Sequence, residues 1–156
     1  MGESFRTKRL RWRFNFFPAY RRTGGRITYI ADDMREVRVK LPLNWTTRNY
    51  YGTLFGGSLY GAIDPIYMIM LIYILGAEYV VWDKAATIQF KKPGRETLYA
   101  KFVLDEAEIN AIKTLLAAEP SVERVYTVDL TDRNGVVHAT CEKTLHIRRR
   151  DAPREG

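Results

Sequence analysis

The residues best suited to chemistry lie in one apolar stretch, where Gly56 and Gly57 are followed by Asp64. If a helix begins at the glycines, their N–H groups are unpaired within it and lie at the positive end of its dipole. Such donors stabilise an oxyanion, and glycine lets a carbonyl approach closely. A carboxylate seven residues further on, among apolar side chains, is suited to act as a general base or nucleophile. The alternative interpretation is that Asp64 satisfies local donors beside a kink.

The stretch that holds these residues, 57–75, predicts a long helix that is apolar on nearly every face. Such a helix must be surrounded by other apolar surfaces. Pro65 would collide with the carbonyl of Gly61 and remove one hydrogen bond, so a bend is expected beside Asp64. A membrane span is the structural alternative, because about 20 apolar residues suffice to cross a bilayer. Asp64 and the strands on either side favour a helix wrapped by a sheet, so no membrane span is expected.

Segments with alternating or β-branched residues flank this helix, two before it and four after it. The expected strands are residues 26–31, 36–41, 84–91, 97–104, 124–130 and 136–147. A smaller helix is expected over residues 107–118, and a short helix over the opening segment. An antiparallel sheet of about six strands buries all of these elements only if it curls around the long apolar helix. The predicted fold class is therefore α+β, in the arrangement known as the hotdog fold.

Length and composition bound the class of protein. The chain has 156 residues, enough for one core, so 1–156 is expected to form a single domain with a basic N-terminal segment, 1–22, and a basic C-terminal tail, 148–156. Cys141 is the only cysteine, which excludes an internal disulfide and favours the cytoplasm. The sequence has no metal-ligand spacing and no glycine-rich nucleotide motif, so no metal and no cofactor are expected.

The net charge of +7 indicates an anionic partner, which is a nucleic acid, a lipid surface or a phosphorylated small molecule. Charge alone does not choose among these. Much of the excess charge lies near the termini, and its simplest interpretation is solvated ends. Nucleic-acid binding would use Trp12, Phe14 and Tyr20 as stacking groups, but no recognised motif accompanies them, so no nucleic-acid partner is expected.

The segment from Asn49 to Asp64 resembles the pattern of phenylacetyl-CoA thioesterases in the hotdog superfamily. That pattern is an Asn, then His-Gly-Gly six residues on, then an Asp seven residues after the second Gly. The chain is more similar still to an uncharacterised branch of the superfamily, a domain of unknown function with a thioesterase-like fold. The shared elements are Gly-Thr-x-Phe-Gly-Gly, Asp-Pro and Trp-Asp-Lys-Ala. Phe55 replaces the His of the thioesterase pattern, which removes a polar group and puts catalysis in question.

The resemblance implies an acyl-coenzyme A thioester hydrolase in which the carboxylate activates water and the glycine N–H groups polarise the carbonyl. The expected catalytic residues are Asp64, Gly56, Gly57 and Asn49, of which the last positions the water or the ligand. The expected substrate-binding residues are Phe55, Tyr60, Lys91, Lys92 and Arg95, of which the last three are candidate phosphate contacts. The alternative is a non-catalytic acyl-CoA or fatty-acyl binding module, in which Phe55 packs against the acyl group; turnover discriminates between the two.

Helix geometry makes the expected site depend on two chains. A rise of about 1.5 Å per residue separates Gly56 from Asp64 by roughly 12 Å along one helix. A bound carbonyl, one attacking water and a basic carboxylate span only about 8 Å. One chain therefore does not supply both groups, and a homodimer or dimer of dimers is expected, with Gly56 of one chain facing Asp64 of the other across a two-fold axis. The family resemblance implies the same assembly.

Overall fold

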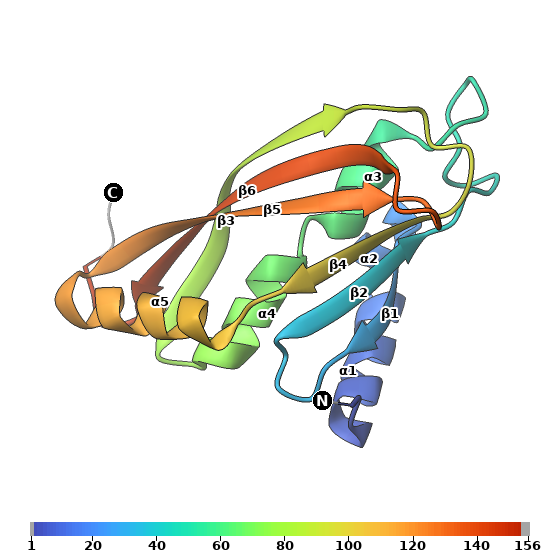
Figure 1. Ribbon diagram of the computed structural model, residues 1–156. Helices are drawn as coiled ribbons and strands as arrows, with labels where there is room; N and C mark the ends of the chain where they lie inside the picture. The colour runs from blue at the N-terminus through green and yellow to red at the C-terminus, as the bar shows by residue number, and fades with distance from the viewer. Residues whose placement is uncertain (1, 154–156) are drawn as a thin grey trace.

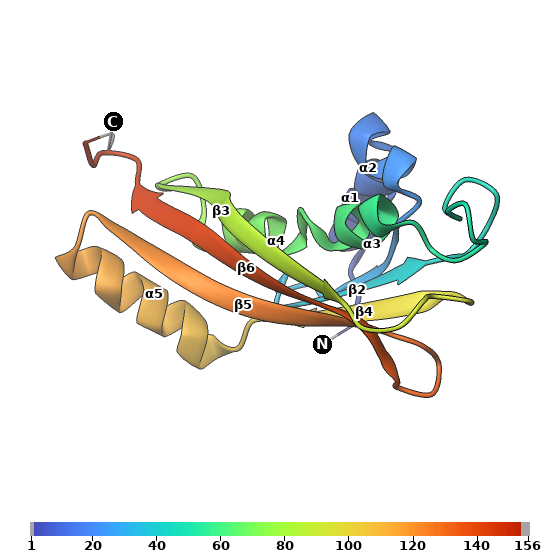
Figure 2. The ribbon, with the colours of Figure 1, turned by 90° about the horizontal axis from the view of Figure 1, so that it is seen from above.

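The computed structural model describes residues 2–153 and contains a six-stranded antiparallel sheet with helices on both faces (Figures 1 and 2). The helices are α1 (Phe5–Phe16), α2 (Pro18–Thr23), α3 (Gly56–Ile63), α4 (Ile66–Leu75) and α5 (Glu106–Ala118). The strands are β1 (Arg26–Ile30), β2 (Glu36–Leu41), β3 (Tyr79–Phe90), β4 (Leu98–Val103), β5 (Ser121–Thr131) and β6 (Val137–Arg149). The α+β class and the antiparallel sheet of six strands are confirmed, and β3 begins five residues earlier than the sequence predicted.

The order of the strands explains why an apolar helix lies in the middle of the fold. The sheet runs β1-β2-β4-β5-β6-β3, so β3 forms one edge although it follows β2 in the sequence. The chain between β2 and β3 must therefore cross the whole face of the sheet, and α3 and α4 make that crossing (Figure 2). β3 pairs with β6 from Tyr79 opposite Arg149 to Phe90 opposite Ala139, and within residues 2–153 no other strand pairs with β3.

The core lies between this crossing helix and the inner face of the sheet. α4 buries Met70 and Leu71 completely, and Phe102 of β4 is equally buried. On the side away from the sheet, Ile72 and Tyr73 are 42% and 45% exposed. The stretch Gly56–Leu75 is long and apolar enough to cross a bilayer by length and composition, and half of its most apolar window is buried within the fold. Part of α4 is thus exposed to solvent, which corrects the expectation that the whole helix is surrounded.

The crossing helix is broken where the sequence predicted a bend. α3 ends at Ile63 and α4 begins at Ile66, because Pro65 has no N–H group to offer the carbonyl of Gly61. Two side chains bind carbonyls near the break: Tyr20 Oη donates to the carbonyl of Ala62 at 2.8 Å, and Lys143 Nζ donates to that of Asp64, also at 2.8 Å. The single helix expected over 57–75 is therefore two helices joined at a proline.

The N-terminal segment is helical, which confirms the short helix expected over the opening residues. Pro18 begins α2, and this helix packs closely on α3. A Cβ atom added to Gly25 would lie 2.8 Å from Cβ of Ala62, and one added to Gly61 would lie 2.7 Å from Cγ2 of Thr23. The absence of side chains at both glycines lets the two backbones approach. At the other end, residues 148 and 149 belong to β6, and residues 154–156 of the expected tail lie outside the described residues.

α5 packs on the opposite face of the sheet from α3 and α4 (Figure 2). Its apolar stripe, with Ile109 and Ile112 buried, confirms the helix expected over 107–118. Glu108 of its first turn accepts two hydrogen bonds from the guanidinium of Arg124, at 2.8 and 2.6 Å, and one from Tyr126 Oη at 2.7 Å. These contacts fasten the helix to β5.

Candidate functional site

Asp64 lies at the break of the crossing helix, and its carboxylate belongs to a polar cluster built from three elements. Its Oδ1 atom accepts hydrogen bonds from Tyr60 Oη at 2.7 Å and from Lys143 Nζ at 2.6 Å. The same ammonium lies 3.0 Å from Oδ1 of Asp83 on β3. The side chain of Lys143 is 1% exposed, whereas that of Asp64 is 40% exposed. A buried cation therefore fixes the position of a carboxylate that solvent still reaches.

The two oxygens of this carboxylate differ in their surroundings. Both donors of the cluster bind Oδ1 of Asp64, and within residues 2–153 no hydrogen bond reaches Oδ2. An ionised carboxylate accepts hydrogen bonds and donates none, so Oδ2 is left to accept from a donor outside the chain, such as water. The arrangement gives one anchored oxygen and one available oxygen.

Burial and charge shape the protonation of the cluster. Burial disfavours the ammonium of Lys143, but its hydrogen bonds to Asp64 and Asp83 outweigh that effect and raise its pKa. Burial raises the pKa of Asp83, with the ammonium opposing and the charge of Asp64 adding to the rise. Burial, together with the hydrogen bond to Asp64, also raises the pKa of Tyr60. Lys143 is therefore held as a cation, and Tyr60 as a neutral hydrogen-bond donor, at physiological pH.

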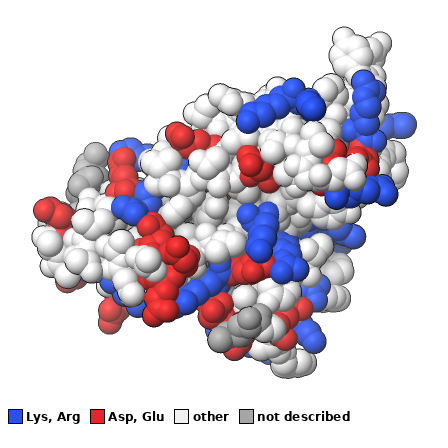
Figure 3. Space-filling view, in the orientation of Figure 1, with Lys and Arg blue, Asp and Glu red and all other residues white. Residues whose placement is uncertain are grey.

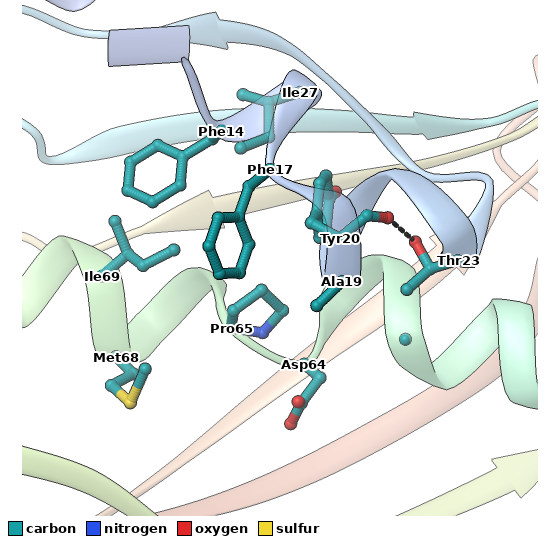
Figure 4. A pocket seen from close by; sticks show the side chains of 11 residues that line it. Phe14, Phe17, Ala19, Tyr20, Thr23, Ile27, Asp64, Pro65, Met68 and Ile69 are labelled. Atoms are coloured by element: carbon teal, nitrogen blue, oxygen red, sulfur yellow. Dashed lines mark hydrogen bonds between the residues drawn. The ribbon is translucent and has the colours of Figure 1, made fainter. Parts of the chain in front are cut away.

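Two cavities adjoin the cluster. The first has a volume of about 310 Å³ and lies between the N-terminal helices and the break, with Asp64 at its floor and its carboxylate directed away from the aromatic rings (Figure 4). Its lining is mainly apolar and includes Phe14, Phe17, Pro65, Met68 and Ile69. The second cavity, about 470 Å³, runs along the edge strand and is lined by Tyr60, Asp83, Lys84, Ala85, Ala86 and Ile88. Asp64 lines the first cavity, while its neighbours Tyr60 and Asp83 line the second.

The glycine pair forms the other end of α3. Gly56 and Gly57 are its first two residues, and within the described chain no carbonyl or side chain accepts from their N–H groups. The ring of Phe55 lies over Gly57, where an added Cβ would be 2.5 Å from Cε1. The ring of Phe90 lies over Gly56, at 3.3 Å from an added Cβ. Both rings are more than half exposed, at 55% and 58%, so two solvent-accessible aromatic groups lie beside the glycine pair.

The remaining predicted residues lie near this glycine end. Lys91, Lys92 and Arg95 are exposed in the turn that follows β3. The N–H of Leu54 donates to the carbonyl of Gly94 at 2.8 Å, which holds that turn beside the loop leading to α3. The structure thus brings the basic turn and the glycines together, whereas Tyr60 and Asp64 lie further along α3, as the helical rise requires.

Asn49 has its hydrogen bonds satisfied within its own loop. Its side-chain oxygen accepts from the N–H groups of Tyr51 and Thr53, at 3.0 and 3.1 Å, and its amide nitrogen donates to Thr53 Oγ1 at 2.9 Å. These bonds shape the turn before α3. Asn49 therefore supports the glycine end indirectly, through the loop that delivers it.

Sequence reasoning missed Lys143 as a member of the site. β6 alternates between inward and outward positions, and Lys143 occupies the same inward row as Cys141, Leu145 and Ile147. A lysine in an otherwise apolar inward row was the available signal, since a buried ammonium requires a carboxylate partner. Asp83 and Lys84 are neighbours in the sequence but form ion pairs with different residues, Asp83 with Lys143 and Lys84 with Glu123.

Among residues 2–153, neither a histidine nor a set of metal ligands lies at the helix break. His138 and His146 lie on β6, where Nδ1 of His138 is 3.1 Å from the carbonyl of Pro93 and its Nε2 is 3.1 Å from Asp132. Among residues 2–153, no three His, Cys, Asp or Glu side chains are grouped so that they could hold a metal ion.

Comparison with known proteins supports the fold. A family described as a domain of unknown function, DUF4442, matches residues 7–147. A Pseudomonas aeruginosa protein of unknown function, described as a probable thioesterase, is 20% identical, with 96% of this chain and 99% of that chain covered and a TM-score of 0.81. A thioesterase from Haemophilus influenzae is 14% identical, with 94% and 93% covered and a TM-score of 0.69. A protein of unknown function from Chlorobaculum tepidum is 16% identical, with 92% and 94% covered and a TM-score of 0.73. Among curated proteins, none matches this sequence.

Proposed function

The chain belongs to the DUF4442 family and has the hotdog fold of thioesterases, and from these premises we propose that it hydrolyses acyl-coenzyme A thioesters. The observation that carries the proposal is the state of Asp64. One oxygen of its carboxylate is anchored by a buried lysine and the other is available, while the residue itself lines an apolar cavity. An anchored carboxylate with an available oxygen is what a general base for water requires, since its geometry is fixed before the substrate arrives.

The proposed reaction uses the N-terminal end of α3 from one chain and the C-terminal end of α3 from the other chain of a dimer. Asp64 Oδ2 takes a proton from a water molecule as the oxygen of that water attacks the thioester carbon. The negative charge that develops on the carbonyl oxygen is stabilised by the N–H groups of Gly56 and Gly57 at the helix N-terminus. When the intermediate collapses, the carbon–sulfur bond breaks, and the proton held by Asp64 passes to the coenzyme A thiolate. The products are a carboxylic acid and free coenzyme A.

The assembly that we propose is a two-fold dimer through β3. The middle of this edge strand, residues 84–87, is exposed on both faces, and Trp82 and Phe90 are 56% and 58% exposed. A long unpaired edge strand with small residues is a template for pairing with another strand. The cavity lined by Tyr60, Asp83 and Ala86 opens along this edge. A second copy paired there would close the cavity and bring its own glycine end towards Asp64.

Each part of an acyl-CoA substrate can be matched by its chemistry to a region of the site. The apolar cavity between α1, α2 and the break suits an acyl chain, because its lining offers apolar and aromatic surface with one carboxylate at the floor. Lys91, Lys92 and Arg95 are exposed beside the glycine end, where they suit the phosphates of coenzyme A. Phe55, above Gly57, suits the region around the thioester.

Asp64→Asn tests the proposal, with hydrolysis measured over a panel of short, long and aromatic acyl-CoA thioesters. We expect turnover to fall by at least about a hundredfold, because the base is lost, while binding of the ligand is preserved. Asp129→Asn on β5 is the matched control, since its carboxylate is exposed and bonds only Thr140 among the described residues. Equal hydrolysis by the wild type and Asp64→Asn would overturn the assignment of the base.

A non-catalytic acyl-CoA or fatty-acyl binding module is the second candidate, and Phe55 favours it. The ring replaces the polar group expected beside the thioester and lies against Gly57. In such a module the same cavity binds the acyl chain without turnover. Tight binding of acyl-CoA across the panel with no hydrolysis by the wild type would select this function.

A further inference from the structure

We propose that α1 is a docking helix for anionic membrane surfaces, with Phe5, Trp12 and Phe16 entering the interface between headgroups and acyl chains. The inference follows from the face that this helix turns to solvent. At 100° per residue, Trp12 lies roughly 200° around the helix from the buried Leu10, and Phe5 and Phe16 lie within about 40° of Trp12. An aromatic stripe therefore runs along the side of α1 that is opposite to its packed side.

The stripe is exposed. Phe5, Trp12 and Phe16 are 83%, 63% and 48% exposed, and the rings of Trp12 and Phe16 are in contact, with centroids 4.1 Å apart. Single exposed apolar residues are ordinary on protein surfaces, but three aligned aromatic residues on one helix face mark a surface that binds a partner. Aromatic side chains are also the residues enriched at the boundary between membrane and water.

The segment that contains α1 and α2 carries a large positive net charge. Residues 5–23 contain seven Arg or Lys residues and no Asp or Glu. The chain has 25 basic and 18 acidic residues, so the remainder has 18 of each and is neutral in net charge. Over the face that carries α5, acidic and basic side chains are interspersed (Figure 3). The net charge of α1 with α2 therefore equals that of the whole protein, because the charges of the remaining residues cancel in sum.

The basic residues flank the aromatic stripe on both sides. Lys8 lies on one side of it, and Arg9 and Arg13 lie on the other, by the same helical geometry. Within residues 2–153 none of these three side chains forms an ion pair, so their charges are available to an external anion. An apolar centre with cationic borders fits an anionic bilayer, because long basic side chains reach the phosphates while the rings enter the interface. A nucleic acid has no apolar layer for a convex aromatic stripe to enter.

The helix also lies beside the apolar cavity. Phe17 follows α1 directly, is 57% exposed and lines that cavity together with Phe14 of α1 (Figure 4). In Figure 2 the N-terminal helices lie on the same side of the sheet as α3 and α4. A docked α1 would place the cavity next to the bilayer, where long acyl chains are held. This last step rests on the proposed function, whereas the docking itself does not.

The experiment is cosedimentation with vesicles made of equal parts of phosphatidylglycerol and phosphatidylcholine, compared with vesicles of phosphatidylcholine alone. We expect binding to the anionic vesicles only, and weaker binding as salt is raised. Arg9→Gln/Arg13→Gln should lower the partition coefficient on the order of twentyfold, since each charge near the surface contributes roughly fivefold. Trp12→Ser/Phe16→Ser should lower it at least about tenfold through lost apolar burial.

Matched controls separate α1 from other surfaces. Tyr50→Ser removes a 98% exposed aromatic residue from the loop before α3, and Lys113→Gln/Arg133→Gln removes two positive charges elsewhere. Both controls should bind vesicles like the wild type. An unchanged urea midpoint for every variant shows that each one is folded.

A second readout follows the helix itself. Trp45→Phe/Trp82→Phe leaves Trp12 as the only tryptophan, and its emission should shift to the blue on anionic vesicles. Unchanged binding by both α1 variants, or loss of binding in Tyr50→Ser, would overturn the proposal. Tighter binding to a single-stranded oligonucleotide than to vesicles, with the α1 variants weakened equally, would reassign the surface to nucleic acid. Loss of hydrolysis in Asp64→Asn leaves this result untouched, so the two proposals fail separately.

Discussion

Lys143 Nζ lies 2.6 Å from Asp64 Oδ1, so a lysine of the last strand holds the carboxylate at the break of the core helix. The ammonium also binds the backbone carbonyl of Asp64 and lies against Asp83 on the edge strand. One buried charge thereby connects three elements. The stability of the fold and the geometry of the proposed base depend on the same side chain.

We expect Lys143→Met to lower the free energy of unfolding by about 3 kcal/mol, because removing the cation leaves two partly buried carboxylates unpaired. Urea denaturation at pH 7 measures the change. Lys84→Met is the control, since Lys84 pairs with Glu123 where both side chains are about half exposed, and it should cost less than about 1 kcal/mol. Equal losses in the two variants would show that the cluster does not hold the break.

Glu108 should account for part of the change in the free energy of unfolding with pH. Its hydrogen bonds from Arg124 outweigh burial and lower its pKa, and the bond from Tyr126 adds to this. A carboxyl whose pKa is depressed in the folded state contributes stability above its unfolded pKa, about 4.3, and this contribution is lost as pH falls through the folded pKa. Glu108→Gln should therefore cost about 2 kcal/mol at pH 7 and flatten the loss of stability in acid.

Glu106→Gln is the control for that measurement. Glu106 lies on the same helix, but its side chain is 72% exposed and its contact with Arg35 is 3.5 Å. Urea melts between pH 7 and pH 3 should leave its profile parallel to that of the wild type. A parallel profile for Glu108→Gln as well would contradict the assignment.

Phe55→Ala tests the ring above the glycine end. If the ring contacts the ligand equally in the ground state and the transition state, its loss should raise KM severalfold and leave kcat nearly unchanged. Steady-state hydrolysis of the best acyl-CoA substrate measures both constants, with Tyr50→Ala as the exposed aromatic control in the preceding loop. A large fall in kcat at constant KM would instead place Phe55 in the chemical step.

Mixed dimers test whether the site is shared between chains. Gly57→Pro removes one N–H donor with a residue that the first helical turn tolerates, and Asp64→Asn removes the base. Each variant alone should be inactive. After unfolding and refolding together, half of the dimers carry one of each chain, and one of their two sites is intact, so about one quarter of the wild-type activity should return. No recovery, with light scattering showing dimers, would place both groups in one chain.

The sequence was most informative where one local pattern decides the structure. Alternation predicted the strands, and Pro65 after Gly61 predicted the break, because a missing N–H group and a ring clash act within one helical turn. The turn before the last strand contains Asn134 and Gly135, a pair that is typical of hairpin turns. The folded state of residues 2–22 was harder to predict, because the packing of α2 depends on small residues at Gly25 and Gly61 that are far apart in the chain.

The polar cluster was only half predictable from the sequence. Asp64 was identified because burying an ionised carboxylate in an apolar helix is costly unless it is paired or has a function. Its partner was not, since Lys143 lies 79 residues away and only the strand order brings it beneath the break. The exposed side of α4 shows the same limit, because a helix that is apolar all round does not reveal which face the sheet will cover.

Lys143 lies on β6, the last strand of the sheet in chain order, and this affects how the protein folds as it is made. During synthesis the helix break and the edge strand are made long before β6. The carboxylates of Asp64 and Asp83 therefore have no ion pair with Lys143 until β6 pairs with β3 and β5. Contacts at such sequence separation form late, because a long loop must close first. The nascent chain therefore exposes an apolar helix and an incomplete sheet until β6 has been synthesised, and protection from aggregation during that interval is a requirement of this topology.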